Sequence, residues 1–180
     1  MCGIFSYKGR SYTRSELKDS VDLIGYRGPD NSHYNTIADN VLFAFHRLAI
    51  VGTTESGDQP MKHPQDESLT LICNGEIYNY KDIAERYDFN LTTGSDCEII
   101  LYLYQKFGIE RTIKELDGVF MFVLHDASSG QLFASRDPIG VRPGFIGTKE
   151  DELFIASEAK PLVQLCETVL PFPPGTWWCS

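Results

Sequence analysis

The amino-acid sequence predicts a single α+β domain whose sheet is mostly antiparallel. Six short apolar segments, rich in β-branched and aromatic residues, are separated by turns, while only a few blocks show helical periodicity. Strands and helices do not alternate in the βαβα rhythm of a parallel sheet, and no internal repeat or linker is visible. A length of 180 residues suits one domain with its own hydrophobic core.

Strands are expected where apolar residues cluster in short runs bounded by turn residues. The first, GIFSY at 3–7, begins almost at the amino terminus. The others are expected at 41–51, 68–74, 119–126, 131–136 and 152–157. The stretch DASSGQL, between the fourth and fifth of these runs, predicts the turn of a β-hairpin.

Helical periodicity is clearest at 15–26, where apolar residues recur on one stripe. A second helix is expected at 95–108, with Ser95 and Glu98 forming a capping box at its start. Shorter helices are expected at 78–87, 109–117 and 157–166.

Charge and cysteine content exclude several classes of protein. A net charge of −9 argues against nucleic acid or an anionic membrane as partner, because both attract basic surfaces. The five cysteines and four histidines are widely scattered and show no zinc-ligand spacing. No apolar stretch approaches the ~20 residues of a membrane span, and the amino terminus lacks a signal-peptide core. The sequence therefore predicts a cytoplasmic protein with reduced thiols, most of them (Cys73, Cys97 and Cys166) in the core.

Cys2 follows the initiator methionine directly. Aminopeptidases remove Met1 before a small residue, which leaves Cys2 with a free α-amino group beside its own thiol. That amino group titrates near pKa ~7.7–8.0, so it can accept the thiol proton directly or through one water. Gly3 leaves space beside the sulfur, and the apolar strand that follows anchors the terminus. Cys2 is therefore interpreted as a nucleophile, the alternative being an arbitrary residue at a disordered end.

Groups that suit a nucleophile's substrate occur at strand ends. Asn74 and the Gly75 N–H form a candidate donor pair for an oxyanion, although an Asn-Gly turn is the alternative. Arg47 is a candidate clamp for a carboxylate. Glu76 and Asp96 are candidates for holding an ammonium group, although a carboxylate at Asp96 is equally expected at the start of a helix.

Eight short motifs occur in order along the chain. They are MCGIF (1–5), YRGPD (26–30), HRLAIVG (46–52), NGEIYN (74–79), GSDCE (94–98), LDGVFMFVLHD (116–126), SRDPIGVRP (135–143) and ASEAK (156–160). Their order and spacing resemble the glutaminase domain of class II glutamine amidotransferases, which are N-terminal nucleophile hydrolases. Within that group, the motif sequences are most similar to those of the first domain of glutamine-hydrolysing asparagine synthetases, and the resemblance covers essentially all of residues 1–180.

The resemblance implies a four-layer αββα sandwich of two antiparallel sheets. It also implies that Cys2 attacks the side-chain amide of L-glutamine and forms a γ-glutamyl thioester, with Asn74 and Gly75 stabilising the oxyanion. Ammonia is released first, and water then hydrolyses the thioester to glutamate.

The same resemblance implies the residues that bind glutamine. Arg47 is expected to hold the α-carboxylate, and Asp96 and Glu76 the α-amino end. Further contacts are expected from the residues after the arginine, which are Leu48, Ala49, Ile50 and Val51.

Two positions depart from the family pattern. Tyr26 stands where histidine often precedes RGPD, and we expect it to alter the support of the glutamine-binding loop. Gly144 stands where a larger apolar residue usually follows RP, and we expect looser packing there. Arg136 and Asp137 are expected to form a structural turn pair near the site.

The chain contains no SGGxDS pyrophosphate loop and no Walker motif. No cofactor is therefore expected, and ATP and magnesium would serve only a synthetase domain or subunit that this chain lacks. The expected partners are L-glutamine and that ammonia-accepting synthetase, with a second copy of the chain as a further candidate. Trp177 and Trp178 form either a docking edge or a final strand.

Two other functions remain open at this point. The chain can be a hydrolase of a γ-glutamyl peptide, in which case the leaving group is an amine. Alternatively, it can be a glutamine-binding module without turnover.

Overall fold

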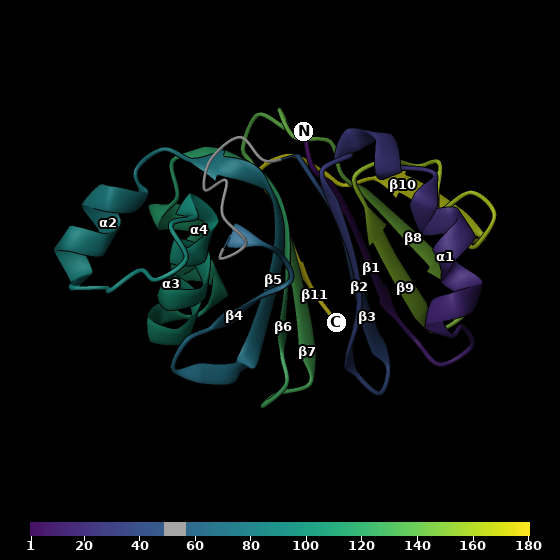
Figure 1. Ribbon diagram of the computed structural model, residues 1–180, viewed down its shortest axis with the longest axis horizontal. Helices are drawn as coiled ribbons and strands as arrows, with labels where there is room; N and C mark the ends of the chain where they lie inside the picture. Colours follow the sequence, from purple (N-terminus) through teal and green to yellow (C-terminus); the bar gives the residue numbers. More distant parts are fainter. Residues whose placement is uncertain (49–56) are drawn as a thin grey trace.

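The computed structural model describes residues 1–48 and 57–180. Two antiparallel sheets lie face to face, with helices covering the outer face of each (Figure 1). This arrangement confirms the predicted four-layer αββα sandwich.

The first sheet has six strands. They are β1 (Gly3–Lys8), β2 (Asn31–Ala38), β3 (Val41–Arg47), β8 (Phe145–Lys149), β9 (Glu152–Ala156) and β10 (Thr168–Pro171). Their order is β10-β8-β9-β1-β3-β2, so the amino-terminal strand lies in the interior of the sheet. Helix α1 (Arg14–Asp22) packs on the outer face and is followed by a short 3-10 helix, η1 (Gly25–Arg27).

The second sheet has five strands in the order β11-β7-β6-β5-β4. They are β4 (Met61–His63), β5 (Asp66–Ile77), β6 (Gly118–Asp126), β7 (Gln131–Arg136) and β11 (Trp177–Cys179). Its outer face is covered by α2 (Tyr80–Tyr87), the 3-10 helix η3 (Asp96–Glu98), α3 (Ile99–Phe107) and α4 (Ile109–Glu115).

Apolar side chains fill the space between the sheets and the space under each helical layer. In β1, Ile4 belongs to the inter-sheet core, whereas Phe5 packs with α1. Both are fully buried. In β3, Phe43 is also fully buried and Phe45 nearly so. Because both faces of these strands are covered, their sequences are continuous apolar runs rather than alternating ones. The amino terminus is thus held inside a packed sheet, as the sequence predicted.

No helix in the described part of the chain combines the length and apolar character needed to cross a membrane.

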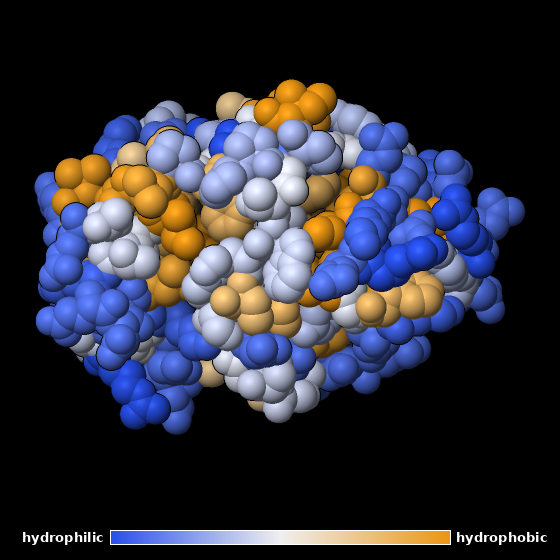
Figure 2. Space-filling model, turned by 180° about the vertical axis from the view of Figure 1, so that it is seen from behind, coloured by the Kyte–Doolittle hydropathy of each residue, from blue (hydrophilic) through white to orange (hydrophobic). Residues whose placement is uncertain are grey.

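On the rear face of the molecule, Figure 2 shows hydrophobic residues gathered in separate patches within a mostly hydrophilic surface.

Most predicted elements form, but two local predictions are wrong. Residues 157–166 make successive turns instead of a helix, with Leu162 and Val163 both donating to the Ala159 carbonyl. Pro161 has no N–H and its ring disfavours the helical conformation of the residue before it, which explains the interruption.

The predicted capping box at Ser95 is also wrong. Ser95 makes no side-chain cap, and the buried Glu98 carboxylate instead accepts the backbone N–H groups of Thr92 and Thr93 at 2.8–3.0 Å. A capping box forms at Thr13 and Glu16 instead, at the start of α1.

Several strands escaped the sequence prediction. They are β2, β4, β8 and β10. The first is a half-exposed edge strand with a polar sequence, and β4 has only three residues, so neither shows an apolar run. The pairing of Trp177 and Trp178 with β7 confirms the final-strand interpretation. The predicted strand at 41–51 ends at Arg47 in β3, and residues 49–51 lie outside the described residues.

Candidate functional site

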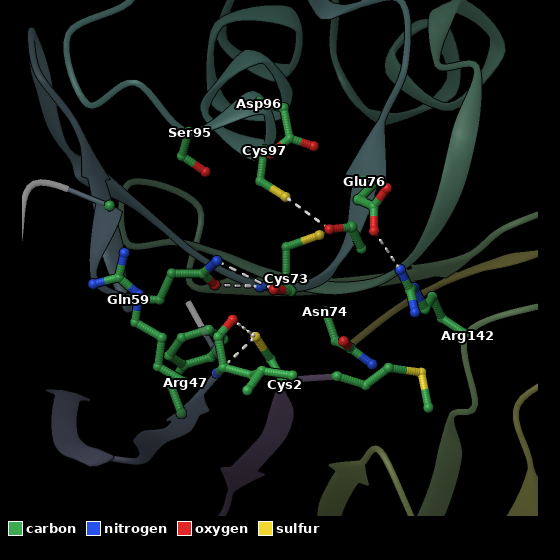
Figure 3. A pocket seen from close by; sticks show the side chains of 15 residues that line it. Cys2, Arg47, Gln59, Cys73, Asn74, Glu76, Ser95, Asp96, Cys97 and Arg142 are labelled. Carbon is green, nitrogen blue, oxygen red and sulfur yellow. Dashed lines mark hydrogen bonds and ion pairs between the residues drawn. The ribbon is translucent and has the colours of Figure 1, made fainter. Parts of the chain in front are cut away.

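A small cavity of about 60 Å³ lies where the ends of β1 and β3 face the end of β5 (Figure 3). It is lined by residues of both sheets, of the amino terminus and of three connecting segments. They are Met1, Cys2, Phe45, Arg47, Leu48, Gly57, Gln59, Cys73, Asn74, Gly75, Glu76, Ser95, Asp96, Cys97 and Arg142. Among the residues that the structure describes, no group of three or more His, Cys, Asp or Glu side chains is placed to hold a metal ion.

Cys2 enters the cavity from the residue before β1. Its Sγ accepts the Leu48 N–H at 3.4 Å and lies 3.6 Å from the Leu48 carbonyl oxygen. The Arg27 Nε donates to the Cys2 carbonyl at 3.0 Å, and Arg27 also pairs with Glu158 at 2.8 Å. The sulfur is therefore held by the main chain of Leu48, and the backbone of Cys2 is held by the Arg27 side chain.

The thiol of Cys2 is partly withdrawn from solvent. Burial raises its pKa, against the opposite effects of the Leu48 N–H, the chain's α-amino group and the Arg47 guanidinium. A raised pKa leaves little thiolate at neutral pH, so the sulfur needs a base beside it to become a nucleophile. Met1 lines the same cavity, and its removal would place the α-amino group on Cys2 itself.

The N–H of Gly75 faces the cavity edge of β5, as the hydrogen bonds at the ends of this strand show. Ala127 N–H donates to the Ser68 carbonyl at 2.9 Å, and Tyr78 N–H donates to the Asp117 carbonyl at 2.8 Å. Alternate residues of an antiparallel strand face opposite neighbours, so the even-numbered residues of β5 bond with β6. Gly75 is odd-numbered, and its N–H therefore faces away from β6.

Asn74 and Gly75 are packed tightly against β6. A side chain at Gly75 would put Cβ within 2.6 Å of the Val119 carbonyl oxygen and 2.7 Å of Phe120 Cβ, so only glycine fits. Asn74 is 2% exposed, and its Nδ2 has no hydrogen-bond partner in the described part of the structure. A buried amide donor without a partner is unusual and points to a ligand group in the cavity.

Arg47 lies at the end of β3, next to the Cys2 side of the cavity, and is almost fully buried. Its guanidinium forms an ion pair with the Asp58 carboxylate. Asp58 is held in turn by Asn31 Nδ2 at 2.9 Å and by His33 Nε2 at 3.2 Å. The site thus contains a fixed guanidinium whose chemistry suits a carboxylate.

Two carboxylates line the opposite wall. Asp96 accepts the Ile77 N–H at 2.6 Å, and Glu76 is half-exposed (Figure 3). Burial raises the pKa of Asp96, and the negative charge of Glu76 adds to this effect. A cation bound between the two side chains would offset the cost of burying the ionised Asp96 and would weaken its repulsion with Glu76.

The Glu76 carboxylate is paired with Arg142 at 3.0 Å. Arg142 belongs to a loop whose backbone N–H groups converge on Asp137, including those of Gly140 at 2.6 Å and Val141 at 2.9 Å. Burial opposes ionisation of Asp137, yet these hydrogen bonds lower its pKa. Arg136 donates to the Gly140 and Arg142 carbonyls of the same loop at 2.7 Å each. Arg136 and Asp137 therefore form the structural turn expected from the sequence.

Gly144 follows this loop and does not loosen the packing. A Cβ at Gly144 would lie 2.6 Å from the Met121 sulfur, so the fully buried Met121 fills the space that a larger residue would need. Tyr26 donates a hydrogen bond to Glu158 at 2.5 Å and is largely exposed. It therefore adds to the ion pair between Arg27 and Glu158 beneath Cys2.

Two further thiols belong to the cavity wall, and their environment differs from that of Cys2. Cys73 and Cys97 are buried, and Cys97 is directed at the Gly75 carbonyl at 3.9 Å (Figure 3). The pKa of Cys97 is raised. The larger cause is its hydrogen bond with the Cys73 thiol, and the second is burial. Cys166 lies elsewhere and is only half-buried, and burial raises its pKa to about 11.

The structure therefore brings most of the residues singled out in the sequence into one cavity. These are Cys2, Arg47, Leu48, Asn74, Gly75, Glu76 and Asp96. Ala49, Ile50 and Val51 lie outside the described residues, so their predicted contacts are not located.

Sequence reasoning missed four residues at the site. Arg27 and Arg142 stand inside the quoted motifs YRGPD and SRDPIGVRP, which was the available signal. Asp58 and Gln59 follow no apolar run and carry no local signal, because their contacts with Arg47 and Cys73, 11 and 14 residues away, form only in the folded chain.

Comparison with known proteins agrees with this geometry. A family model described as a glutamine amidotransferase domain matches residues 1–171. The chain belongs to this class II glutamine amidotransferase family. It is 43% identical over 175 residues to the asparagine synthetase [glutamine-hydrolyzing] of Mesocricetus auratus and to that of Homo sapiens, and 40% identical over 176 residues to that of Gallus gallus. These matches cover 96% of this chain but 31% of each relative, so the amidotransferase chain spans about a third of their length.

Solved structures share the fold of this amidotransferase domain. A glutamine phosphoribosylpyrophosphate amidotransferase from B. subtilis superposes with a TM-score of 0.80 at 19% identity, covering 99% of this chain and 47% of that chain. The structure described as the allosteric regulatory enzyme of purine biosynthesis gives the same TM-score and identity, and 46% of that chain is covered. At this identity the likeness establishes the N-terminal nucleophile hydrolase fold alone.

Proposed function

We propose that this domain, taken as residues 1–180, hydrolyses L-glutamine to glutamate and ammonia with Cys2 as an N-terminal nucleophile. One observation carries the proposal. A single cavity contains the sulfur of a cysteine that becomes the chain terminus on loss of Met1, and an unpaired buried amide donor at Asn74. The same cavity holds groups of both charges for the two ends of an amino acid.

The substrate is held as a zwitterion. Arg47 is the group that pairs with the α-carboxylate, because a guanidinium binds a carboxylate through two parallel N–H bonds. Asp96 and Glu76 take the α-ammonium on the opposite wall. The side-chain amide of glutamine then extends toward Cys2 and Asn74.

In the first half-reaction, the α-amino group of Cys2 accepts the thiol proton while Sγ attacks the amide carbon. The C–S bond forms, and the carbonyl oxygen becomes an oxyanion that accepts from Asn74 Nδ2 and the Gly75 N–H. The ammonium of Cys2 gives its proton to the amide nitrogen. The C–N bond breaks, and ammonia leaves a γ-glutamyl thioester on Cys2.

In the second half-reaction, water gives a proton to the same amino group and adds to the thioester carbon. The same two donors stabilise the second oxyanion. The C–S bond breaks, the sulfur takes the proton back, and glutamate is released. One residue thus supplies both the nucleophile and the base.

Ammonia is proposed to pass to an asparagine-synthetase-like domain or subunit, because the relatives are glutamine-hydrolysing asparagine synthetases. Exposed apolar side chains lie near the cavity: Tyr26 shares a surface hollow with Leu48, and Ile139 and Val141 belong to the loop from which Arg142 reaches the cavity lining. In Figure 2, one hydrophobic patch lies at the top of the molecule, the end at which Figure 1 places the amino terminus. Exposed apolar residues near the cavity suit a partner that covers it and keeps ammonia from bulk water.

The test is release of glutamate and ammonia from L-glutamine by the purified chain, with and without an asparagine synthetase domain. Cys2→Ala is expected to reduce glutamate release by at least ~10³-fold, because it removes the covalent route. Cys166→Ala is the matched control and should keep the wild-type rate. Release of an amine from γ-glutamyl peptides at a higher rate than ammonia from glutamine would overturn the choice of substrate. Binding of glutamine without turnover would overturn the proposal that the chain is an enzyme.

A further inference from the structure

Three N–H groups face the same way along β5, beyond the point at which β4 stops pairing with it. They belong to Cys73, Gly75 and Ile77, which alternate with the residues that bond to β6. The first donates to Gln59 Oε1 at 2.5 Å and the third donates to Asp96 at 2.6 Å. The middle group, that of Gly75, lies between two fixed positions and faces the cavity.

The first of these positions is held by a side chain where a strand residue would be expected. Antiparallel pairing of Met61 with Leu71 would, if continued, place residue 59 opposite Cys73. Strand β4 begins only at Met61, so the pairing does not continue to this position. The side-chain amide of Gln59 makes both bonds instead, accepting the Cys73 N–H and donating Nε2–H to the Cys73 carbonyl at 3.1 Å.

These bonds are shielded from solvent. Gln59 is 6% exposed and Cys73 is 2% exposed. Buried main-chain groups that lose their partners must find others, and the strand shifts to reach them. Asn74 is the next residue, and Gly75 follows it, so a shift at Cys73 moves both proposed oxyanion donors.

We propose that Gln59 is a positioning residue that fixes the end of β5, so that the Asn74 amide and the Gly75 N–H point at the reacting carbonyl. This inference rests on the proposed glutaminase function. Gln59 acts through Cys73 and donates nothing to the substrate. Donors aimed at an oxyanion stabilise the transition state more than the bound amide, so Gln59 influences kcat more than KM.

The test compares Gln59→Met with the wild-type chain. Methionine has a similar length and apolar volume but can neither accept nor donate the two bonds. The variant is expected to lower kcat for glutamate release about tenfold or more, with KM for L-glutamine changed less than about threefold. In a Cys2→Ala background, Gln59→Met should leave the calorimetric Kd for L-glutamine unchanged within the same factor.

Ser135→Ala is the matched control. Ser135 is buried in β7 of the same sheet, lies outside the cavity lining, and donates a hydrogen bond to the Thr176 carbonyl at 3.0 Å. Its substitution removes a buried bond between a side chain and the main chain, as Gln59→Met does. It should lower the thermal unfolding temperature while leaving kcat within about twofold. Equal losses of kcat in both variants would overturn a positioning role.

A double-variant cycle with Asn74→Ala provides the second measurement. If Gln59 acts through the donors, Gln59→Met should lower kcat by a much smaller factor in the Asn74→Ala background than in the wild-type chain. Independent, multiplicative losses would overturn the proposal, as would an unchanged kcat in folded Gln59→Met. If Gln59→Met does not fold, Gln59→Glu replaces it, since glutamate keeps an acceptor for the Cys73 N–H, and an intermediate kcat is expected.

The wild-type and Cys2→Ala chains are measured in the same assay, which separates the two hypotheses. If the wild-type chain releases no glutamate, or Cys2→Ala releases it at the wild-type rate, the proposed function is wrong and the Gln59 role falls with it. If both behave as expected while Gln59→Met keeps its rate, only the positioning role is wrong.

Discussion

The two walls of the cavity are held in different ways. On the side of the first sheet, Cys2 and Arg47 extend from neighbouring strands whose main-chain register pairs Gly3 with His46. On the side of the second sheet, β5 runs past its neighbour, and the side chains of Gln59 and Asp96 take over the main-chain bonds.

This difference separates two kinds of sensitivity. The proposed nucleophile is placed by an interior strand, bonded on both sides, so few single side-chain changes can displace it. The proposed oxyanion donors and ammonium ligands depend on individual side chains. We therefore expect substitutions on the second wall to alter rate and affinity without unfolding the chain, whereas the first wall is sensitive mainly at Cys2 and Arg47 themselves.

The largest effect within the second wall is expected for Asn74→Ala. Removing one oxyanion donor should lower kcat by ~10²–10³-fold while KM changes by less than about threefold, because the donor acts mainly in the transition state. Steady-state assays of glutamate release measure both constants. Asn79→Ala is the matched control. Asn79 lies just after the same strand and bonds the Glu115 carbonyl at 2.8 Å, away from the cavity. A full rate in Asn74→Ala would remove this residue from the proposed mechanism.

A smaller effect, in the other constant, is expected for Arg47→Met on the first wall. Loss of the carboxylate clamp should raise KM for L-glutamine ~10–100-fold with a lesser change in kcat. Because the substitution also leaves Asp58 without its ion pair, thermal unfolding should be measured alongside. Arg86→Met serves as control, since Arg86 forms an exposed ion pair with Glu115 on the outer helices. An unchanged KM in folded Arg47→Met would contradict the clamp.

The smallest effect is expected in the pH dependence of KM. Binding of an ammonium group needs ionised Asp96, whose pKa is raised by burial and by the charge of Glu76. As pH falls through this raised pKa, Asp96 takes a proton and KM should rise by a few fold, at a higher pH than an ordinary aspartate would give. In Asp96→Asn, KM should be higher throughout and this acidic limb should disappear. An identical limb in the variant would assign the titration to another group.

How much of this could be predicted from the sequence depends on the range of the interactions involved. Strands buried on both faces, such as β1 and β9, were recognisable because each is a continuous apolar run. The cavity residues were recognisable through ordered motifs. Two features could not be predicted because they depend on tertiary contacts. Glu98 binds Thr92 and Thr93 rather than capping its own helix, and Gln59 bonds the β5 main chain at Cys73, 14 residues along the chain, through its side chain.

The most direct test of the central claim is intact-mass analysis of the active chain, quenched with acid during turnover of L-glutamine and followed by peptide mapping. The account predicts a chain without Met1 that carries one γ-glutamyl group on Cys2, and no such adduct in Cys2→Ala. Active protein that retains Met1, or a γ-glutamyl adduct on any other residue, would contradict it.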